Sequence, residues 1–289
     1  MVRALGLMLV LATVVGCLTA CGEGLALSPA RKGLPPAAGG TLLRKIQDRG
    51  KMIVGVKYDV PMFGLLDRRT NKVEGFDADI AREIVGYILG NLDAVEFREV
   101  LPKNRISSLQ DGMLDLVIST MTINAEREQQ IDFSVVYYVA GQSLLVPRNS
   151  KIAGVQDLVN KRVGTARGST SEQNIRAVAP QVDVQLFDSY SAAVAAMDAG
   201  QLDVVTTDDN ILIGFQAKEP NKWKLVGGTF TKEPYGVGVA KGHPELVEAV
   251  NQVIRDLKAS GKWNEIYKRN IPSDPPDPPI DDWRKIVGQ

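Results

Sequence analysis

Two stretches of the chain, DGMLDLVIST at residues 111–120 and AGQLDVVTTD at residues 199–208, align with each other without a gap. The first contains GMLD and the second GQLD, so a glycine, a leucine and an aspartate recur at matching places. Both patterns are typical of a helix end, a glycine that stops the helix, a tight turn and a buried strand. The repeat is too widely spaced for a solenoid and predicts two related lobes, although helix–glycine–strand connections also look alike by chance.

Strands and helices alternate around this repeat. KMIVGVKY at residues 51–58 is an apolar, β-branched run typical of a strand. GFDADIAREIVGYILG at residues 75–90 places apolar side chains four residues apart, on one face of a helix. A similar succession of strand, helix and strand returns between residues 161 and 207. This alternation predicts an α/β fold with largely parallel sheets.

Composition argues against several classes of function. The 289 residues include 34 basic and 34 acidic side chains, which gives no reason to expect a nucleic-acid partner. His243, the only histidine, lies in KGHPE, typical of a solvated turn, so histidine catalysis is not expected. Both cysteines precede residue 22, which leaves no thiol catalyst, disulfide or zinc–thiolate site beyond it. No GxGxxG follows a strand, which disfavours a nucleotide-binding oxidoreductase.

The N-terminus has the pattern of an export signal. A basic residue precedes an almost unbroken apolar run at residues 4–16, which is too short for a confident membrane span. LTAC at residues 18–21 resembles the bacterial lipobox, with Cys17 as a second candidate and an ordinary cleaved signal as the alternative. We expect residues 1–20 to be a lipoprotein signal peptide and Cys21 to carry the lipid that anchors the protein to the outer face of the cytoplasmic membrane.

The two flanking segments differ in composition from the rest. Residues 21–40 are rich in Gly, Pro and Ala and are expected to form a flexible tether. Residues 272–289 are proline-dense and acidic and are expected to be extended outside the core, although Trp283 could dock them back. The domain boundaries predicted between them are residues 41–140 and 233–271 for lobe 1 and residues 141–232 for lobe 2.

Charged side chains follow several predicted strands. Ligands of open α/β sheets bind beyond the carboxyl ends of the strands. Lys57, Thr120, Arg167 and Asp208 lie at four such ends, and Arg127 follows one of them closely. If two lobes face each other, the cleft between them holds cations, one carboxylate and hydroxyls. That combination suits a small zwitterion with an additional negative charge.

Six motifs can be recognised along the chain: EGFDADIA (74–81), TMTINAEREQQIDFS (120–134), RGSTSEQNI (167–175), TTDDNIL (206–212), EPYGVGVAKG (233–242) and GKWNEIYKR (261–269). Their order and spacing resemble bacterial solute-binding protein family 3, the amino-acid receptors of ABC importers, over residues 41–271. GVKYDVP at residues 55–61 is most similar to the glutamate-type receptors of actinobacteria. The resemblance implies a two-lobed periplasmic-binding-protein-like fold of type II, with two Rossmann-like lobes joined by two hinge crossovers, and neither a cofactor nor a metal.

The resemblance also implies ligand-binding roles for particular residues. Arg127 would clamp the ligand α-carboxylate with its planar guanidinium, and Asp208, rather than the adjacent Asp209, would take the α-ammonium. Thr170 would add donors at a helix start, where the helix dipole favours an anion. The hydroxyl-bearing segment expected beside Arg127 consists of Ser119, Thr120 and Thr122.

The side-chain pocket determines which amino acid binds. Arg167 and Lys57 are two further cations, and they favour glutamate or aspartate over asparagine or glutamine, although Lys57 could equally be a solvated strand end. Tyr58 and Tyr235 are expected to wall the cleft, although a core tyrosine is the commoner case.

We expect the two lobes to close around the ligand by a hinge motion and the closed monomer to dock on a membrane permease without chemistry. One alternative is an enzyme on the same fold, a cyclohexadienyl or prephenate-type dehydratase, for which Asp208 or Asp59 would be the general acid. Another is a sensor that signals through a separate membrane partner.

Overall fold

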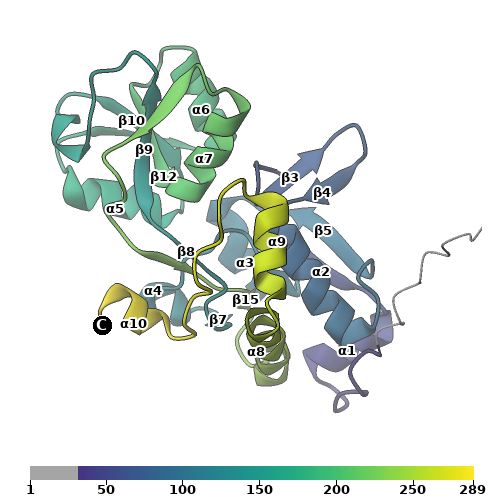
Figure 1. Ribbon diagram of the computed structural model, residues 1–289. Coiled ribbons are helices and arrows are strands. Elements are labelled where there is room, and N and C mark those ends of the chain that lie inside the picture. Colours follow the sequence, from purple (N-terminus) through teal and green to yellow (C-terminus); the bar gives the residue numbers. More distant parts are fainter. Residues whose placement is uncertain (1–31) are drawn as a thin grey trace, which may run out of the picture. The chain divides into compact units, whose positions relative to one another are not determined.

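The computed structural model describes residues 32–289, and within that range no helix is long and apolar enough to cross a membrane. The signal peptide expected at residues 1–20, the lipid attachment at Cys21 and the alternative at Cys17 lie outside the described residues. The described chain forms two α/β lobes (Figure 1), which confirms the predicted fold class.

The first lobe is built on these elements: β1 (Met52–Val56), α2 (Phe76–Leu89), β5 (Val95–Glu99), α3 (Arg105–Gln110), β6 (Leu116–Val117), β7 (Asp132–Phe133) and β15 (Gly238–Val239). Its sheet has the order β5-β1-β6-β15-β7. β1 is parallel to β5 and β6, while β15 returns from late in the chain and pairs antiparallel with β6 and β7. Helical crossovers connect the parallel strands, as parallel pairing requires.

The second lobe is built on a matching set: β9 (Gln142–Pro147), β10 (Arg162–Ala166), α5 (Thr170–Val178), β11 (Asp183–Phe187), α6 (Tyr190–Asp198), β12 (Val204–Asp208), α7 (Asp209–Lys218) and β13 (Trp223–Val226). The strand order is β11-β10-β12-β9-β13. β10 is parallel to β11 and β12, and β9 is antiparallel to β12 and β13. The parallel triplets β5-β1-β6 and β11-β10-β12 therefore correspond.

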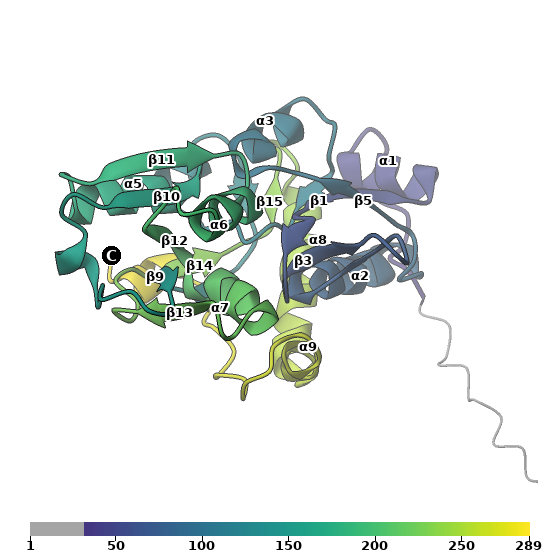
Figure 2. The same cartoon turned by 90° about the horizontal axis from the view of Figure 1, so that it is seen from above.

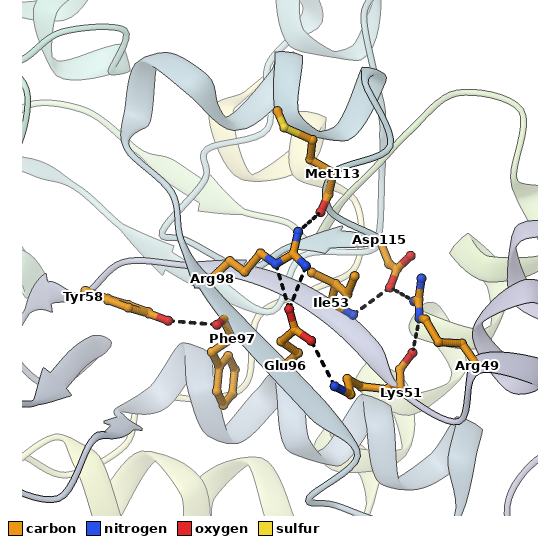
Figure 3. Close-up of polar contacts among 9 residues, drawn as sticks. All are labelled: Arg49, Lys51, Ile53, Tyr58, Glu96, Phe97, Arg98, Met113 and Asp115. Atoms are coloured by element: carbon orange, nitrogen blue, oxygen red, sulfur yellow. Dashed lines mark hydrogen bonds and ion pairs between the residues drawn. The ribbon is translucent and has the colours of Figure 1, made fainter.

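The aspartate of the sequence repeat has the same structural role in both lobes. In the first lobe, Asp115 accepts a hydrogen bond from the Ile53 amide at 2.7 Å and forms an ion pair with Arg49 (Figure 3). In the second lobe, Asp203 accepts from the Arg162 amide at 2.9 Å and from the guanidinium of the same residue at 2.9 Å. In each lobe, the aspartate before one parallel strand thus binds the start of the adjacent parallel strand. The repeated aspartate therefore supports the fold.

Two short strands connect the lobes: β8 (Tyr138–Ala140) and β14 (Glu233–Tyr235), which pair antiparallel. Tyr138 stacks on Tyr235 with ring centroids 5.6 Å apart. α8 (Pro244–Ala259) and α9 (Lys262–Asn270) then return to the first lobe, where the Trp263 indole donates to the Tyr137 carbonyl at 2.7 Å. Apolar and aromatic burial therefore holds the crossovers against the first lobe.

Short elements complete the fold: α1 (Leu42–Arg49), β2 (Asp59–Val60), β3 (Gly64–Asp67), β4 (Lys72–Glu74), α4 (Ala125–Glu128), α10 (Trp283–Val287) and two single 3₁₀ turns (Pro102–Asn104 and Val155–Asp157). β2, β3 and β4 form a small antiparallel sheet. Figure 2 shows α6 and α7 of the second lobe beside this sheet, and both helices contact β2.

The described part of the expected tether packs on the first lobe. The Leu34 amide donates to the Ile88 carbonyl at 3.1 Å, and the Ala37 amide donates to Gln47 Oε1 at 2.7 Å. A side-chain acceptor of α1 and a backbone carbonyl of α2 therefore hold these residues, and composition alone does not predict these contacts.

The expectation that residues 272–289 lie extended outside the core is wrong for their last part. Trp283 is only 7% exposed and packs against Ile123 and Val136 of the first lobe. The gain from burying a large indole explains why an otherwise proline-rich segment folds back.

Candidate functional site

Arg127 lies in α4, a single helical turn that Asn124 caps by accepting from the Arg127 amide at 2.9 Å. Its guanidinium is buried and donates to the carbonyls of Thr122, at 2.7 Å, and of Gly168 in the other lobe, at 3.4 Å. Burial, and then the charge of Arg105, lower the pKa of Arg127 to about 9, so it remains charged at neutral pH. No ion pair to it occurs within residues 32–289, so this buried cation favours an external anion.

The segment before Arg127 is held in a strained conformation. Thr120 has φ 43°, in the left-handed region that a β-branched residue rarely adopts. Buried Asp77 accepts from the Thr120 amide at 2.8 Å and from the Tyr137 hydroxyl at 2.8 Å. Arg105 donates to the carbonyl of Ser119 at 3.0 Å. The buried carboxyl group of Asp77 and the buried guanidinium of Arg105 thus hold this segment in place. Desolvation raises the pKa of Asp77 to about 6.

Lys57 lies immediately after β1 and is 3% exposed. Its ammonium lies 3.5 Å from Ser119 Oγ and 5.5 Å from the ring centroid of Tyr190, which begins α6 in the second lobe. Burial, and then the charge of Arg105, lower the pKa of Lys57 to about 7. An anion bound nearby would restore its charge, because opposite charges favour the ionised form.

Asp208 ends β12 and is also 3% exposed. One carboxylate oxygen accepts from the Tyr235 hydroxyl at 2.5 Å, and the other has no hydrogen-bond partner among residues 32–289. Burial, and then the charge of Glu233, raise the pKa of Asp208 to about 8. A ligand cation at the unpartnered oxygen would lower that pKa.

Glu233 of β14 joins the two lobes. Its Oε2 accepts from the hydroxyls of Thr122, at 2.7 Å, and Thr170, at 2.9 Å. Its Oε1 accepts from the Asn174 amide at 2.8 Å. A hydroxyl has a single proton, so neither threonine can donate to a second carboxylate while it donates to Glu233.

The loop before α5 brings the second lobe close to the first. Ser169 caps α5 by accepting from the Glu172 amide at 3.3 Å. Gly168 has φ 76°, and a Cβ there would lie 2.8 Å from the Cα of Lys103 in the first lobe. Glycine is therefore required both by the backbone conformation and by the closeness of the lobes.

Further contacts show that the lobes are closed on each other. Lys103 of the first lobe donates to Asp188 at 2.6 Å, and the Ser191 amide donates to Asp59 at 3.1 Å. Beside these contacts, a hollow of about 490 Å³ opens next to Arg127. Both lobes line it, through Pro102, Lys103, Arg105, Ile106, Ser107, Gln110, Met121, Asn124, Glu126, Arg127, Gln130, Gly168, Ser169, Glu172, Gln173 and Arg176.

Two residues expected in the cleft are placed differently. The Tyr58 hydroxyl donates to the Phe97 carbonyl at 2.9 Å, and its ring lines a separate hollow at the outer edge of the first lobe. Arg167 directly follows β10, at the strand end where it was expected, but it is exposed. Burial therefore does not support a role for Arg167 in reading a second carboxylate.

Three buried charged residues of the site were not found from the sequence. Glu233 lies in EPYGVGVAKG, interpreted only as a return crossover, and Asp77 lies in EGFDADIA, interpreted only as a helix start. Arg105 lies in a short helix with no motif. Glu233 and Asp77 each lie directly beside a predicted apolar strand or helix start, and a charged residue in such a place could have indicated a buried polar site.

The arrangement suits a small zwitterion. Arg127 of the first lobe and Asp208 of the second are both buried, and both lack a salt-bridge partner among the described residues. The guanidinium can pair with an anionic group, and the carboxyl group of Asp208 becomes the partner of a cationic group once that group lowers its pKa. Within residues 32–289 the structure contains no group of three or more His, Cys, Asp or Glu side chains that could hold a metal.

The family model of bacterial extracellular solute-binding proteins, family 3, matches residues 52–273. A glutamine-binding protein from Geobacillus stearothermophilus is 51% identical over 73% of this chain and 80% of the relative. The ABC transporter glutamine-binding protein GlnH of Bacillus subtilis (strain 168) is 44% identical over 81% and 85%. The glutamate-binding protein GluB of Corynebacterium efficiens is 30% identical over 89% and 86%, so the glutamine-binding relatives are more similar.

Solved structures agree with these relatives. An ancestral arginine-binding protein bound to glutamine superposes with a TM-score of 0.71 at 38% identity, covering 78% of this chain and 99% of that one. A shared fold and a shared family model therefore rest on independent comparisons.

Proposed function

Because this chain belongs to the bacterial extracellular solute-binding proteins of family 3, we propose that it binds a free amino acid between its lobes and delivers it to an ABC permease. The observation that carries the proposal is the pair Arg127 and Asp208, a basic and an acidic side chain buried on opposite lobes. Arg127 takes the α-carboxylate and Asp208 the α-ammonium. Both contacts exist together only when the lobes are closed, so the ligand stabilises closure.

Glutamine is the proposed ligand, in place of the acidic amino acids favoured by the sequence. The exposed Arg167 offers no buried partner for a second carboxylate, while Glu233 adds a buried negative charge to the cluster. Relatives named as glutamine-binding at 51% and 44% identity support the same choice. Glutamate, aspartate and asparagine are the competing ligands.

The other contacts follow from the geometry around Arg127. Lys57, which follows β1, and Ser119, which lies just beyond β6, are close together and are proposed to face the ligand side chain. Thr122 and Thr170 can donate to the ligand carboxylate only after their hydroxyl hydrogen bonds to Glu233 have broken. Tyr235 orients Asp208, as its hydrogen bond indicates.

Isothermal titration calorimetry on protein freed of carried-over ligand by unfolding and refolding tests the proposal. We expect tight binding of glutamine and weaker binding of glutamate, aspartate, asparagine and arginine. Prephenate is included because the raised pKa of Asp208 also provides a protonated carboxyl, as a dehydratase requires. Consumption of prephenate, or silence toward every amino acid, would overturn the receptor function.

The family is extracytoplasmic, and we propose that Cys21 carries the lipid that holds this member, as a monomer, at the outer face of the membrane. Fractionation of cells that produce Cys21→Ser should move the protein out of the membrane fraction. If Cys21→Ser stayed in the membrane fraction, Cys21 would not be the anchor, and Cys17 would be tested next.

A further inference from the structure

Residues 274–289 lie beyond the family match, which ends at residue 273, and yet they form an ordered element. Asp282 caps α10 by accepting from the Arg284 amide at 3.0 Å, and Gly288 ends the helix in the left-handed conformation. Trp283 is 7% exposed. This segment therefore packs against the rest of the protein through Trp283, and the residues that it contacts indicate its role.

Its polar contacts meet at Glu128, the residue after Arg127. The Trp283 indole donates to Glu128 Oε1 at 3.0 Å, and the Arg284 guanidinium donates to Oε2 at 2.6 Å. Arg284 also lies over the Trp283 ring, 4.6 Å from its centroid. Both carboxylate oxygens of the last residue in α4 are thus occupied by α10.

The apolar contacts of α10 lie on both sides of α4 in the sequence. Trp283 packs on Ile123, which adjoins Thr122, and on Val136, which leads into the crossover strand β8.

Asp281 adds polar contacts just before α10. The Val136 amide donates to the Asp281 carbonyl at 3.2 Å. The Asp281 side chain pairs with Arg255 of α8 at 2.8 Å and with Lys258 at 3.0 Å. The segment thereby ties α8 to the loop that carries Arg127.

α4 needs such support. It is a single turn of four residues, far too short to be stable alone. It must also keep the guanidinium of Arg127 buried, which raises the free energy of the folded state. A short helical turn that also bears the cost of a buried charge opens locally unless neighbouring contacts restrain it.

We propose that residues 281–287 form a C-terminal clasp that positions Arg127, with Trp283 and Arg284 acting through Glu128. The clasp pre-organises the ligand-binding loop, so less conformational freedom is lost when the ligand binds. This inference rests on the proposed binding function but concerns residues outside the family match.

The test compares the full chain with a form that ends at residue 273, with Trp283→Phe and with the control Lys285→Ala. Lys285 is exposed and takes no part in the two hydrogen bonds to Glu128. Glutamine titration should show a Kd roughly tenfold weaker for the truncated form and severalfold weaker for Trp283→Phe, which keeps an aromatic ring but loses the donor to Glu128. Lys285→Ala should match the parent. If the clasp only added stability, the truncated form and Trp283→Phe would show a lower Tm and an unchanged Kd, and that result would overturn the proposal.

Hydrogen exchange of the backbone amides of residues 122–128 gives a readout that does not depend on the ligand. Truncation and Trp283→Phe should each speed exchange in this segment, while residues 204–208 of the second lobe should exchange as in the parent. Unchanged exchange at residues 122–128 would reject the clasp. If the parent binds no amino acid but exchange responds as stated, the binding function fails and the clasp stands.

Discussion

In the first lobe β1 passes beneath Leu114 at Gly55, where a Cβ would lie 2.5 Å from a leucine methyl. In the second lobe β10 passes beneath Leu202 at Gly164, where the same distance would be 2.2 Å. Each glycine makes room for the leucine of the repeated turn, so the two central strands are packed alike. The lobes thus share a scaffold as far as the ends of their parallel strands.

Beyond the strand ends the lobes differ in charge. The first lobe buries three basic side chains, Lys57, Arg105 and Arg127, beside the carboxyl group of Asp77, whereas the second offers the carboxyl group of Asp208. The scaffold repeats, but the chemistry is divided between the copies. A ligand with both an anionic and a cationic group satisfies both lobes, while a ligand with one of them leaves a buried charge unpaired.

The largest effect is expected from Arg127→Ala in the first lobe. Loss of the only proposed carboxylate clamp should weaken glutamine binding by a factor on the order of 10³, or about 4 kcal/mol. Calorimetry measures this, with circular dichroism to confirm the fold. Retained affinity within tenfold of the parent would remove Arg127 from the site.

Asp208→Asn tests the second lobe and should weaken binding about 50-fold, because the ammonium loses its counter-charge. The same substitution should raise the free energy of unfolding relative to the parent as the pH increases. Burial raises the pKa of Asp208 from 3.8 to about 8, so its contribution to folding is full below about pH 4 and is lost as the pH rises through 8. Denaturant unfolding should therefore show Asp208→Asn gaining on the parent from pH 5 to pH 8. A constant difference over that range would contradict the raised pKa.

The matched aspartates of the scaffold should affect stability and leave binding unchanged. Asp115→Ala should lower the free energy of unfolding by about 2 kcal/mol and Asp203→Ala by about 1 kcal/mol, because the first side chain is 5% exposed and the second 33%. Urea titration measures both. Equal losses would show that burial does not set the size of the loss, and a changed Kd for either variant would show that these aspartates do more than support the fold.

Glu233→Gln should have the smallest effect and should change selectivity. Removing the negative charge beside Thr122 and Thr170 should improve glutamate binding about fivefold and glutamine binding less. Competition between the two amino acids measures the ratio. A loss of affinity for both would instead make Glu233 a required partner in closure.

Much of the scaffold and part of the site could be predicted from local patterns. Alternating strands and helices indicated two α/β lobes, and the rule that ligands bind beyond strand ends singled out Lys57 and Asp208. Arg127 followed from a motif. The inferences about the scaffold hold because hydrophobic period and glycine stops are properties of short segments, whereas the binding roles of these three residues stay predictions.

The sequence by itself thus determined the two lobes, their repeat and the opposite charges at their strand ends. Tertiary structure alone decided that Glu233 meets Thr122, 111 positions away, and that Trp283 meets Glu128, 155 positions away. It also placed Tyr58 at an outer edge and Arg167 in solvent. The physical reason is that strand order, lobe closure and the docking of a distant segment are set by burial summed over the whole chain, which no short segment encodes.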